Sequence, residues 1–444
     1  MPVGVSEFGS IVLQIDGVEI AVWHEYSFQN HFLIPCDGFR FSLGDEMMFD
    51  GLFDLLRPGK RVQLLINGKL QATGYIDVVD FSGDRSSGNV VTIEGRDVFS
   101  PLVDSEIDPQ KRYPDQTPLV KLLQDTFEPF GFDTFFVDNE ANSSVAAGKF
   151  INRPKKKTKQ LASYRLTQTK PHHNERYFDF ISRITQREGL WCWPTVDGQG
   201  VIVGNPDFDQ APRYQIIRKN GGAANNILSG GIRYDSTDQP SYIVATGNIP
   251  PTEHEHTRTR LVADNPYTMF PDPVAQFIAP TTNVRDEQVA QFNPLAGNTQ
   301  RSRPGEQAGE VLTFSSAAIR EHQELFKWTE VIPAKPIQLP NTFASLVAKP
   351  KYLKDTESRT QDQLRRFALR QMSLYVRRAV VGRYVIMGHE LDGQPVQIDT
   401  VVDVQDDRSN WHGPMWILSR TLRKSRSGGT TTEIETLPLN SLVF

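Results

Sequence analysis

The chain has 444 residues, of which 38% are hydrophobic and 23% charged, and a formal net charge of −5 at pH 7. This length predicts two to four domains rather than one core. The small net charge gives no overall attraction to nucleic acid, no apolar run approaches the roughly 18 residues of a membrane helix, and the first residues lack a secretion signal.

The first hundred residues have a β pattern. Asp16-Gly17 and Asn67-Gly68 each lie between two alternating apolar arms. Such pairs supply the positive φ angles of two-residue hairpin turns. With further glycine corners at short spacing, the pattern predicts a small antiparallel barrel or sandwich.

Two helices are predicted next. Thr117 is placed to cap the first, with Pro118 in its first turn, and Gly131 ends it. The second runs near 175–188 and stops at Gly189, followed by a hairpin around Asp197-Gly198. Between the helices, residues 138–160 lose periodicity and contain four lysines that we interpret as a solvated loop, at Lys155, Lys156, Lys157 and Lys159.

Proline dominates the following region. Residues 250–350 contain twelve prolines and three glycines, a composition that resists helix and central strand. We expect a long excursion with few short strands there. A third helix is predicted near 357–379, with apolar Leu364 and Met372 on one side and arginines opposite.

One stretch of the sequence occurs twice. Residues 76–94 and 417–435 align at an offset of 341 positions, which superposes Gly88 on Gly429 and Glu94 on Glu435. A Gly-x-x-Val-Gln segment precedes each, at Gly59, Val62 and Gln63 and at Gly393, Val396 and Gln397. Chance similarity of two hairpins is the alternative, because turns draw on few residue types. The repeat predicts one β-domain present in two copies, with the two glycines at turn positions.

Catalytic and metal motifs are scarce. No phosphate loop, dinucleotide fingerprint, nucleophile elbow or His-Glu-x-x-His segment occurs. His254 and His256 alternate and are the best metal candidates, but a third ligand is missing. Acids that we considered for glycosidase chemistry are not distinguished from surface acids; they are Glu106, Asp108, Asp403, Asp406 and Asp407. We therefore predict no cofactor and no enzyme activity.

Aromatic and thiol groups have structural interpretations. Trp191 and Trp193 alternate, as a sugar-stacking pair would, but their apolar neighbours favour the core. The two cysteines, Cys36 and Cys192, are too few for a disulfide framework, and we expect buried free thiols.

Three segments together resemble the baseplate hub proteins of contractile-tailed, Mu-like phages, which are related to type VI secretion spike proteins. They are the 74–108 segment with Gly95-Arg96-Asp97 and Leu102-Val103-Asp104, the 177–206 helix and hairpin, and the run from the arginine-rich helix to the end. The shared order of elements covers about three quarters of the chain, and residues 250–310 have no counterpart. No single motif is highly specific.

This resemblance implies an α+β, mainly β chain with two tube-like antiparallel β-barrels joined by small α+β modules. The expected domains are a first barrel at 1–105, an α+β module at 106–210, strands of the second barrel with the proline-rich excursion at 211–355, and a helix with the rest of that barrel at 356–444.

The resemblance also implies a homotrimer in which six barrels form a ring. Such a ring would join the tail tube protein to the central spike protein and contact baseplate wedge or other tail proteins. DNA would pass through its lumen without specific binding. We expect the protein in the virion tail baseplate, assembled in the host cytoplasm, without membrane insertion. The two repeat turns are the expected inter-barrel contacts, with Arg85, Ser86, Gly88, Arg426, Ser427 and Gly429.

Two alternatives to the hub remain at this point. The first is a tail-tip enzyme that acts on the cell wall. The second is a carbohydrate- or receptor-binding module that uses Trp191 and Trp193.

Overall fold

The computed structural model describes most of the chain outside residues 248–360. The described residues are 2–3, 11–44, 52–84, 88–132, 134–137, 166, 169–206, 208, 210–221, 225–240, 242–247, 260–264, 274–278, 289–293, 298–299, 309–315, 329–332, 350–355, 361–439 and 441. The chain forms two compact units, one of Met1–Ile232 with Gly382–Leu437 and one of Arg233–Val381 with Pro438–Phe444. The boundaries of the four predicted domains are not tested by this division and stay predictions.

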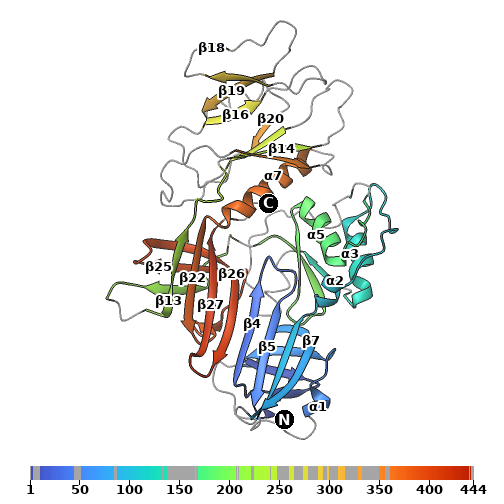
Figure 1. Cartoon of the computed structure of the whole chain (residues 1–444), viewed down its shortest axis with the longest axis vertical. Helices are drawn as coiled ribbons and strands as arrows, with labels where there is room; N and C mark the ends of the chain where they lie inside the picture. Colours follow the sequence, from blue (N-terminus) through green and yellow to red (C-terminus); the bar gives the residue numbers. More distant parts are fainter. Residues whose placement is uncertain are drawn as a thin grey trace. The chain divides into compact units, whose positions relative to one another are not determined.

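The first unit is built on a continuous sheet of 14 strands (Figure 1). Its main path runs β1-β3-β2-β6-β7-β8-β5-β4-β26-β27-β22-β13, and β25 joins β12 to β26. The strands are β1 (Pro2–Val3), β2 (Ile11–Ile15), β3 (Val18–Ile20), β4 (Glu25–His31), β5 (Gly38–Gly44), β6 (Arg61–Ile66), β7 (Lys69–Asp84), β8 (Gly88–Asp97), β12 (Tyr214–Arg218), β13 (Ile227–Tyr234), β22 (Val380–Met387), β25 (Val401–Asp406), β26 (Trp411–Ser425) and β27 (Gly429–Pro438).

The mainly β class with large antiparallel sheets is confirmed. Both predicted two-residue hairpins are present: β2 and β3 join at Asp16 and Gly17, and β6 and β7 join at Asn67 and Gly68, all with positive φ. Among the described strands the path stays open at β1 and β13. Closure into barrels therefore stays a prediction.

The same strand order occurs twice within this sheet. In the first copy, the strands in chain order β2, β4, β5, β6, β7 and β8 lie side by side as β2-β6-β7-β8-β5-β4. In the second copy, β12, β13, β22, β25, β26 and β27 lie as β12-β25-β26-β27-β22-β13. If each set is numbered one to six along the chain, both read 1-4-5-6-3-2. The repeat seen in the sequence is thus a repeat of topology.

Local details agree with this equivalence. Gly88 and Gly429 each begin the return strand of a hairpin, with φ of 72° and 67°. The third and sixth strands of each copy are linked by the same cross-strand ion pair, Arg40 with Glu94 at 3.2 Å and Arg383 with Glu435 at 3.4 Å. These exposed pairs add little stability, but they mark equivalent positions.

The copies also differ. The first and fourth strands are antiparallel in the first copy (β2 and β6) and parallel in the second (β12 and β25). The predicted match of the Gly-x-x-Val-Gln segments is wrong, because Val62 and Gln63 lie in β6 whereas Val396 and Gln397 precede β25. The strand equivalent to β6 begins only at Val401.

A small α+β module follows the first copy. It contains α2 (Ser100–Asp104), α3 (Leu119–Phe127), η2 (Glu128–Phe130), β9 (Thr134–Val137), α5 (Tyr177–Thr185), η4 (Gln186–Glu188), β10 (Trp191–Pro194) and β11 (Gly200–Gly204). The helices bury one apolar face each, including Leu122, Phe127 and Phe180, against β11. Gly131 and Gly189 end them in the left-handed region, as predicted. The predicted Thr117 cap is wrong: its hydroxyl donates to the Pro114 carbonyl, at 2.7 Å, and Pro118 is the N-cap.

The second unit contains α7 (Gln361–Val376) and two sheets of four strands each, β20-β15-β14-β21 and β16-β19-β17-β18. Leu364, Ala368 and Met372 are buried on α7, as the pattern predicts. Its other strands are β14 (Tyr242–Gly247), β15 (Arg260–Asp264), β16 (Val274–Ile278), β17 (Val289–Asn293), β18 (Asn298–Thr299), β19 (Gly309–Ser315), β20 (Thr329–Ile332) and β21 (Pro350–Asp355). The proline-rich excursion therefore contains short strands.

Gly429 allows a direct test of the second repeat hairpin. A Cβ added there meets no atom within 4 Å, so any cost comes from the backbone conformation alone. Gly429→Val should destabilise the first unit by about 1–2 kcal/mol, because a β-branched residue resists the left-handed region. Gly429→Asn should cost less, because Asn tolerates that region. Urea unfolding measures both; equal stability of the Val and Asn variants would contradict the assignment.

Candidate functional site: the junction between the two sheet copies

The two copies are joined by one pair of strands, β4 of the first and β26 of the second (Figure 1). They are antiparallel, with Tyr26 opposite Lys424 at one end and His31 opposite Ser419 at the other. β25 pairs only with the earlier part of β26, from Trp411 to Trp416. The later part therefore has an edge without a partner from its own copy, and β4 occupies it.

Apolar packing reinforces this pairing. Leu422 of β26 is completely buried and belongs to the core cluster of the first copy, where it lies opposite Phe28. A side chain of the second copy thus completes the core of the first. Burial of a leucine contributes about 1.5–3 kcal/mol, so the junction is part of the folded core and not a loose contact.

Arg420 is the polar centre of the junction. Its Nε donates to Asn30 Oδ1 at 2.7 Å and its Nη1 donates to Gln71 Oε1 at 2.9 Å. It also donates to the Val396 carbonyl, and its guanidinium lies 5.7 Å from the centre of the Phe28 ring. Burial lowers the pKa of Arg420 to about 10, which still leaves it charged at neutral pH. This one side chain ties three segments from both copies together.

Two carboxyl groups are linked to this arginine through Asn30: Asp37, which is half-buried, and Asp97, which is buried. Asn30 donates to Asp37 Oδ2, and the Asp37 backbone donates to Asp97 Oδ2 at 2.9 Å. Cys36 Sγ donates to Asp97 Oδ1 at 3.0 Å. Burial, with the neighbouring Asp97 charge, raises the pKa of Asp37 to about 8, and burial raises the pKa of Asp97. The pair therefore keeps a proton that an exposed pair would lose.

A neutral histidine makes a second bridge. His389 Nε2 lies 2.7 Å from the Tyr26 hydroxyl of the first copy, and its Nδ1 lies 2.8 Å from Thr432 Oγ1 of the second. Burial, with the nearby Arg420 charge, lowers the pKa of His389 to about 3. Its ring therefore acts as a neutral hydrogen-bonding link between the copies.

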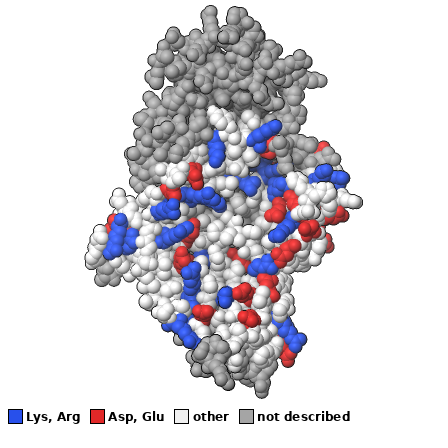
Figure 2. Space-filling model, viewed as in Figure 1, with Lys and Arg blue, Asp and Glu red and all other residues white. Residues whose placement is uncertain are grey.

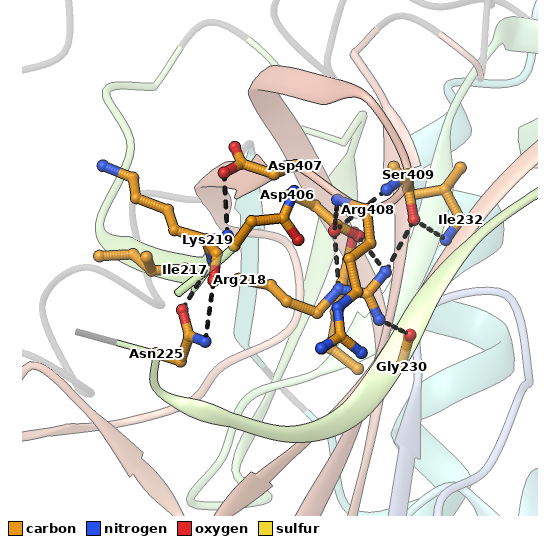
Figure 3. A network of polar contacts seen from close by, with 12 residues as sticks. Ile217, Arg218, Lys219, Asn225, Gly230, Ile232, Asp406, Asp407, Arg408 and Ser409 are labelled. Atoms are coloured by element: carbon orange, nitrogen blue, oxygen red, sulfur yellow. Dashed lines mark hydrogen bonds and ion pairs between the residues drawn. The ribbon is translucent and has the colours of Figure 1, made fainter. Parts of the chain in front are cut away.

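A further polar network fixes the outer strands of the second copy (Figure 3). Arg218 at the end of β12 makes a two-point ion pair with Asp406 of β25, at 2.7 and 2.9 Å. Arg218 also donates to Ser409 Oγ at 3.0 Å and to the Gly230 carbonyl, and Ser409 Oγ accepts from the Ile232 backbone. Burial acts to raise the pKa of Asp406, but hydrogen bonds from Arg218 and Ser409 hold it below its usual value.

Sequence comparison finds a known family similar to the first copy. Residues 10–97 match the model described as "Mu phage baseplate assembly protein GpP-like, N-terminal". The amino-terminal β-domain is therefore similar to GpP-like baseplate domains. No curated protein matches the chain in sequence.

Two solved structures share the fold, and a third is more distantly similar. A tail protein from Neisseria meningitidis MC58 superposes with a TM-score of 0.63 at 17% identity, over 97% of this chain and 98% of that one. The 43 kDa tail protein of prophage MuSo2 from Shewanella oneidensis gives 0.62 at 13% identity, over 98% and 99%. A component of the type VI secretion system, E. coli c3393, gives 0.45 at 8% identity over 96% and 76%. The phage tail likeness expected from the sequence is confirmed.

Of the predicted turn contacts, Arg426 touches the other copy. Its Nη2 lies 2.7 Å from His24 Nδ1. Ser427 is exposed in the same turn. Arg85 and Ser86 lie outside the described residues, as do His254, His256 and the four lysines of the predicted loop. Contacts of the turns between protomers stay a prediction.

Four of the five candidate catalytic acids are held by structural partners. Asp406 is engaged by Arg218, and Asp403 accepts from Gln405 at 3.0 Å. Asp108 accepts from the Gln110 backbone at 2.8 Å, and Asp407 from the Asn220 backbone at 3.1 Å. Glu106 pairs with Arg176 through an isolated backbone β-bridge, which does not involve its carboxylate. The described residues contain no cluster of three or more His, Cys, Asp or Glu side chains placed to hold a metal ion.

The two tryptophans pack against an aromatic side chain of the first copy. The Phe32 ring centre lies 5.1 Å from that of Trp193 and 6.2 Å from that of Trp191. The contact is one of side-chain packing, but both tryptophans are half-buried and lie outside the fully buried core that was expected. Both cysteines are free but half-buried, and burial raises the pKa of both thiols.

Sequence reasoning missed the residues that build the junction. None of Arg420, Leu422, Asn30 and His389 was predicted to make a contact between the two copies. The repeat itself contained the missing signal: the offset of 341 aligns Arg420 with Val79 and Leu422 with Phe81. A charged residue at an otherwise apolar repeat position indicates a contact that only one copy makes.

Removal of the central arginine should destabilise the first unit. Arg420→Leu leaves three buried acceptors without their donor, at about 1–3 kcal/mol each, so a loss of about 3 kcal/mol or more is expected in urea unfolding. Arg423→Leu on the same strand is the matched control. Arg423 is 57% exposed and pairs with Glu433 at 3.5 Å, so its loss should cost less than about 1 kcal/mol. Equal losses would contradict the central role of Arg420.

The stability of the first unit should depend on pH through Asp37. Because the folded pKa of Asp37 is raised to about 8, the folded state holds a proton that the unfolded chain releases above about 3.9. The contribution of this proton to the free energy of unfolding is complete below the unfolded-state pKa of Asp37. It is lost as the pH rises through the folded-state pKa. Lowering the pH from 8 to 7 should therefore stabilise the protein by about 1 kcal/mol, measured by urea unfolding.

Asp37→Asn is the control, and it should remove this slope. Below about 6.5 the effect of His389 has the opposite sign, because its depressed folded pKa makes the unfolded state take up the proton. A wild-type slope between pH 8 and 7 that survives in Asp37→Asn would show that another group is responsible.

Proposed function

We propose that the protein is a structural hub of a phage tail baseplate, in which three copies of the chain form a ring of six similar β-domains. The observation that carries this proposal is the strand order 1-4-5-6-3-2, present twice in one chain and joined head to tail through β4 and β26. Head-to-tail contacts generate a closed ring when the rotation that relates successive subunits adds up to a full turn.

The ring would act as a symmetry adapter. Six equivalent domains present a six-fold face on which a hexameric tail tube protein can stack. The chain itself repeats only three times, so parts outside the duplicated domains present a three-fold face that suits a trimeric central spike protein. Baseplate wedge or other tail proteins are the expected neighbours at the rim. The function is therefore geometric, and it needs no catalytic group.

The surface charge fits a passive conduit. Over the described residues of the face in Figure 2, basic and acidic side chains intermingle, which differs from the clustered basic surface that binds nucleic acid. In our proposal, DNA passes through the ring without specific binding. The particle forms in the host cytoplasm and ends in the virion. In the described part of the chain, no helix has the length and apolar character to cross a membrane.

The two alternative functions have less support. Four of the five acids considered for cell-wall hydrolysis accept hydrogen bonds from structural partners. The tryptophans considered for sugar stacking pack on Phe32. The GpP-like match and the tail-protein fold both point to a structural baseplate role.

Assembly is the decisive test of the hub. The purified chain should have the mass of a trimer, alone or after mixing with its spike protein, and negative-stain views down the axis should show six similar densities around a central hole. Mass photometry and microscopy measure these properties. A stable monomer in the presence of the spike protein would contradict the proposal. Clearing of peptidoglycan in a zymogram would instead favour the enzyme.

A further inference from the structure

Among the described residues of the first copy, no strand covers the β7 edge that is equivalent to the β26 edge covered by β4. In the second copy, β4 occupies the part of β26 beyond β25. In the first copy, β6 pairs with β7 only from Lys69 to Tyr75. From Val78 onward, β8 is the one strand that pairs with β7 among the described residues. The edge of β7 from Val78 to Gly83 is thus the equivalent of the edge of β26 that β4 covers.

Exposure of the side chains agrees with this. At the offset of 341, Phe81 stands where Leu422 stands and Val78 where Ser419 stands. Phe81 is 44% exposed and Val78 48%, whereas Leu422 is fully buried and Ser419 is 8% exposed. Phe53 of the short helix α1 (Leu52–Leu55), itself exposed, stacks on Phe81 with ring centres 4.6 Å apart. A large apolar group therefore lies at a position that, in the second copy, enters the core of the neighbouring domain.

The complementary edge is on β13. By strand order β13 is the equivalent of β4, and among the described strands it has a single neighbour, β22. Leu228 at its start is 55% exposed. Two of its backbone groups are held by side chains, the Gly230 carbonyl by Arg218 and the Ile232 amide by Ser409. Side chains that bind edge backbone groups in this way protect the edge from non-specific strand pairing. A matching strand can take their place by forming hydrogen bonds with the same backbone groups.

We propose that β7 of one protomer pairs antiparallel with β13 of a second copy of this chain, as β26 pairs with β4 within the chain. Phe81 then enters the core of the second sheet copy of the neighbour, as Leu422 enters that of the first. Every protomer has one β7 edge and one β13 edge, on opposite sides of the sheet in Figure 1, so the contact is head to tail and three protomers close the proposed ring. This inference rests on the proposed hub function and names its protomer contact.

The occupant follows from the internal junction. β4 and β26 show that this sheet fold binds another copy of itself by adding strand to strand, with an apolar side chain passing across. The two uncovered edges belong to the equivalent strands: β7 of the first copy corresponds to β26, and β13 of the second copy corresponds to β4. We therefore take a second copy of the chain as the partner, because the β4–β26 pairing within one chain already shows how the two edges fit together.

Single substitutions test each edge. Phe81→Asp and Leu228→Asp should each convert the trimer into a monomer in mass photometry, because each places a charge in a closed apolar contact. Phe81→Leu, which copies Leu422, should keep the trimer. Met387→Asp is the matched control: Met387 is 73% exposed on β22, which has strand neighbours on both sides, so this variant should also stay trimeric. Far-UV circular dichroism and urea midpoints check that every variant is folded.

A mixture gives the sharper result. Phe81→Asp keeps the β13 edge and Leu228→Asp keeps the β7 edge, so the two variants together should form a species of two chains that cannot close. Single variants that still form trimers, or a mixture that stays monomeric, would overturn the β7–β13 pairing while leaving the hub function intact. A wild-type chain that stays monomeric with its spike protein would remove the hub function and this pairing together.

Discussion

The architecture of the first unit depends on one strand pairing, β4 with β26, because it turns two separate sheets into a continuous one. Backbone hydrogen bonds alone would make this a weak, register-tolerant contact. Leu422 and Arg420 remove that tolerance. A one-residue slip would move Leu422 out of the core and separate Arg420 from Asn30 and Gln71. The junction is therefore specified by one apolar and one charged side chain, two residues apart on the same face of β26.

The junction combines an apolar contact, made by the buried Leu422, with a cluster of polar groups around the buried Arg420. Around Arg420 lie a neutral histidine and two carboxyl groups whose pKa values are raised. Such groups contribute little net stability compared with apolar packing, and they penalise any arrangement that leaves them unpaired. We infer that they fix the relative position of the two sheet copies, which a ring of such domains requires more than it requires additional stability.

The sequence revealed the repeat but not the contact it makes. Gly88 and Gly429 were predictable because a left-handed turn position limits the residue types that fit, and the Asp-Gly and Asn-Gly hairpins were predictable for the same reason. The helices ended at Gly131 and Gly189, as expected from their sequence. The junction could not be read in this way, since Asn30 and Arg420 are hundreds of residues apart and no local pattern links them. The Gly-x-x-Val-Gln similarity was misleading, because the same residue types occur at positions that are not structurally equivalent in the two copies.

The place where the second unit leaves the sheet has its own consequence. The second and third strands are linked by six residues, 32–37, between β4 and β5, whereas the equivalent link between β13 and β22 contains residues 235–379. The two copies are alike in their strands and differ in this connection. In a closed assembly of three chains, every alternate position around the circle would carry the large insertion. The insertion would thus distinguish odd from even positions in such a ring, while the two sheet copies keep the same strand order.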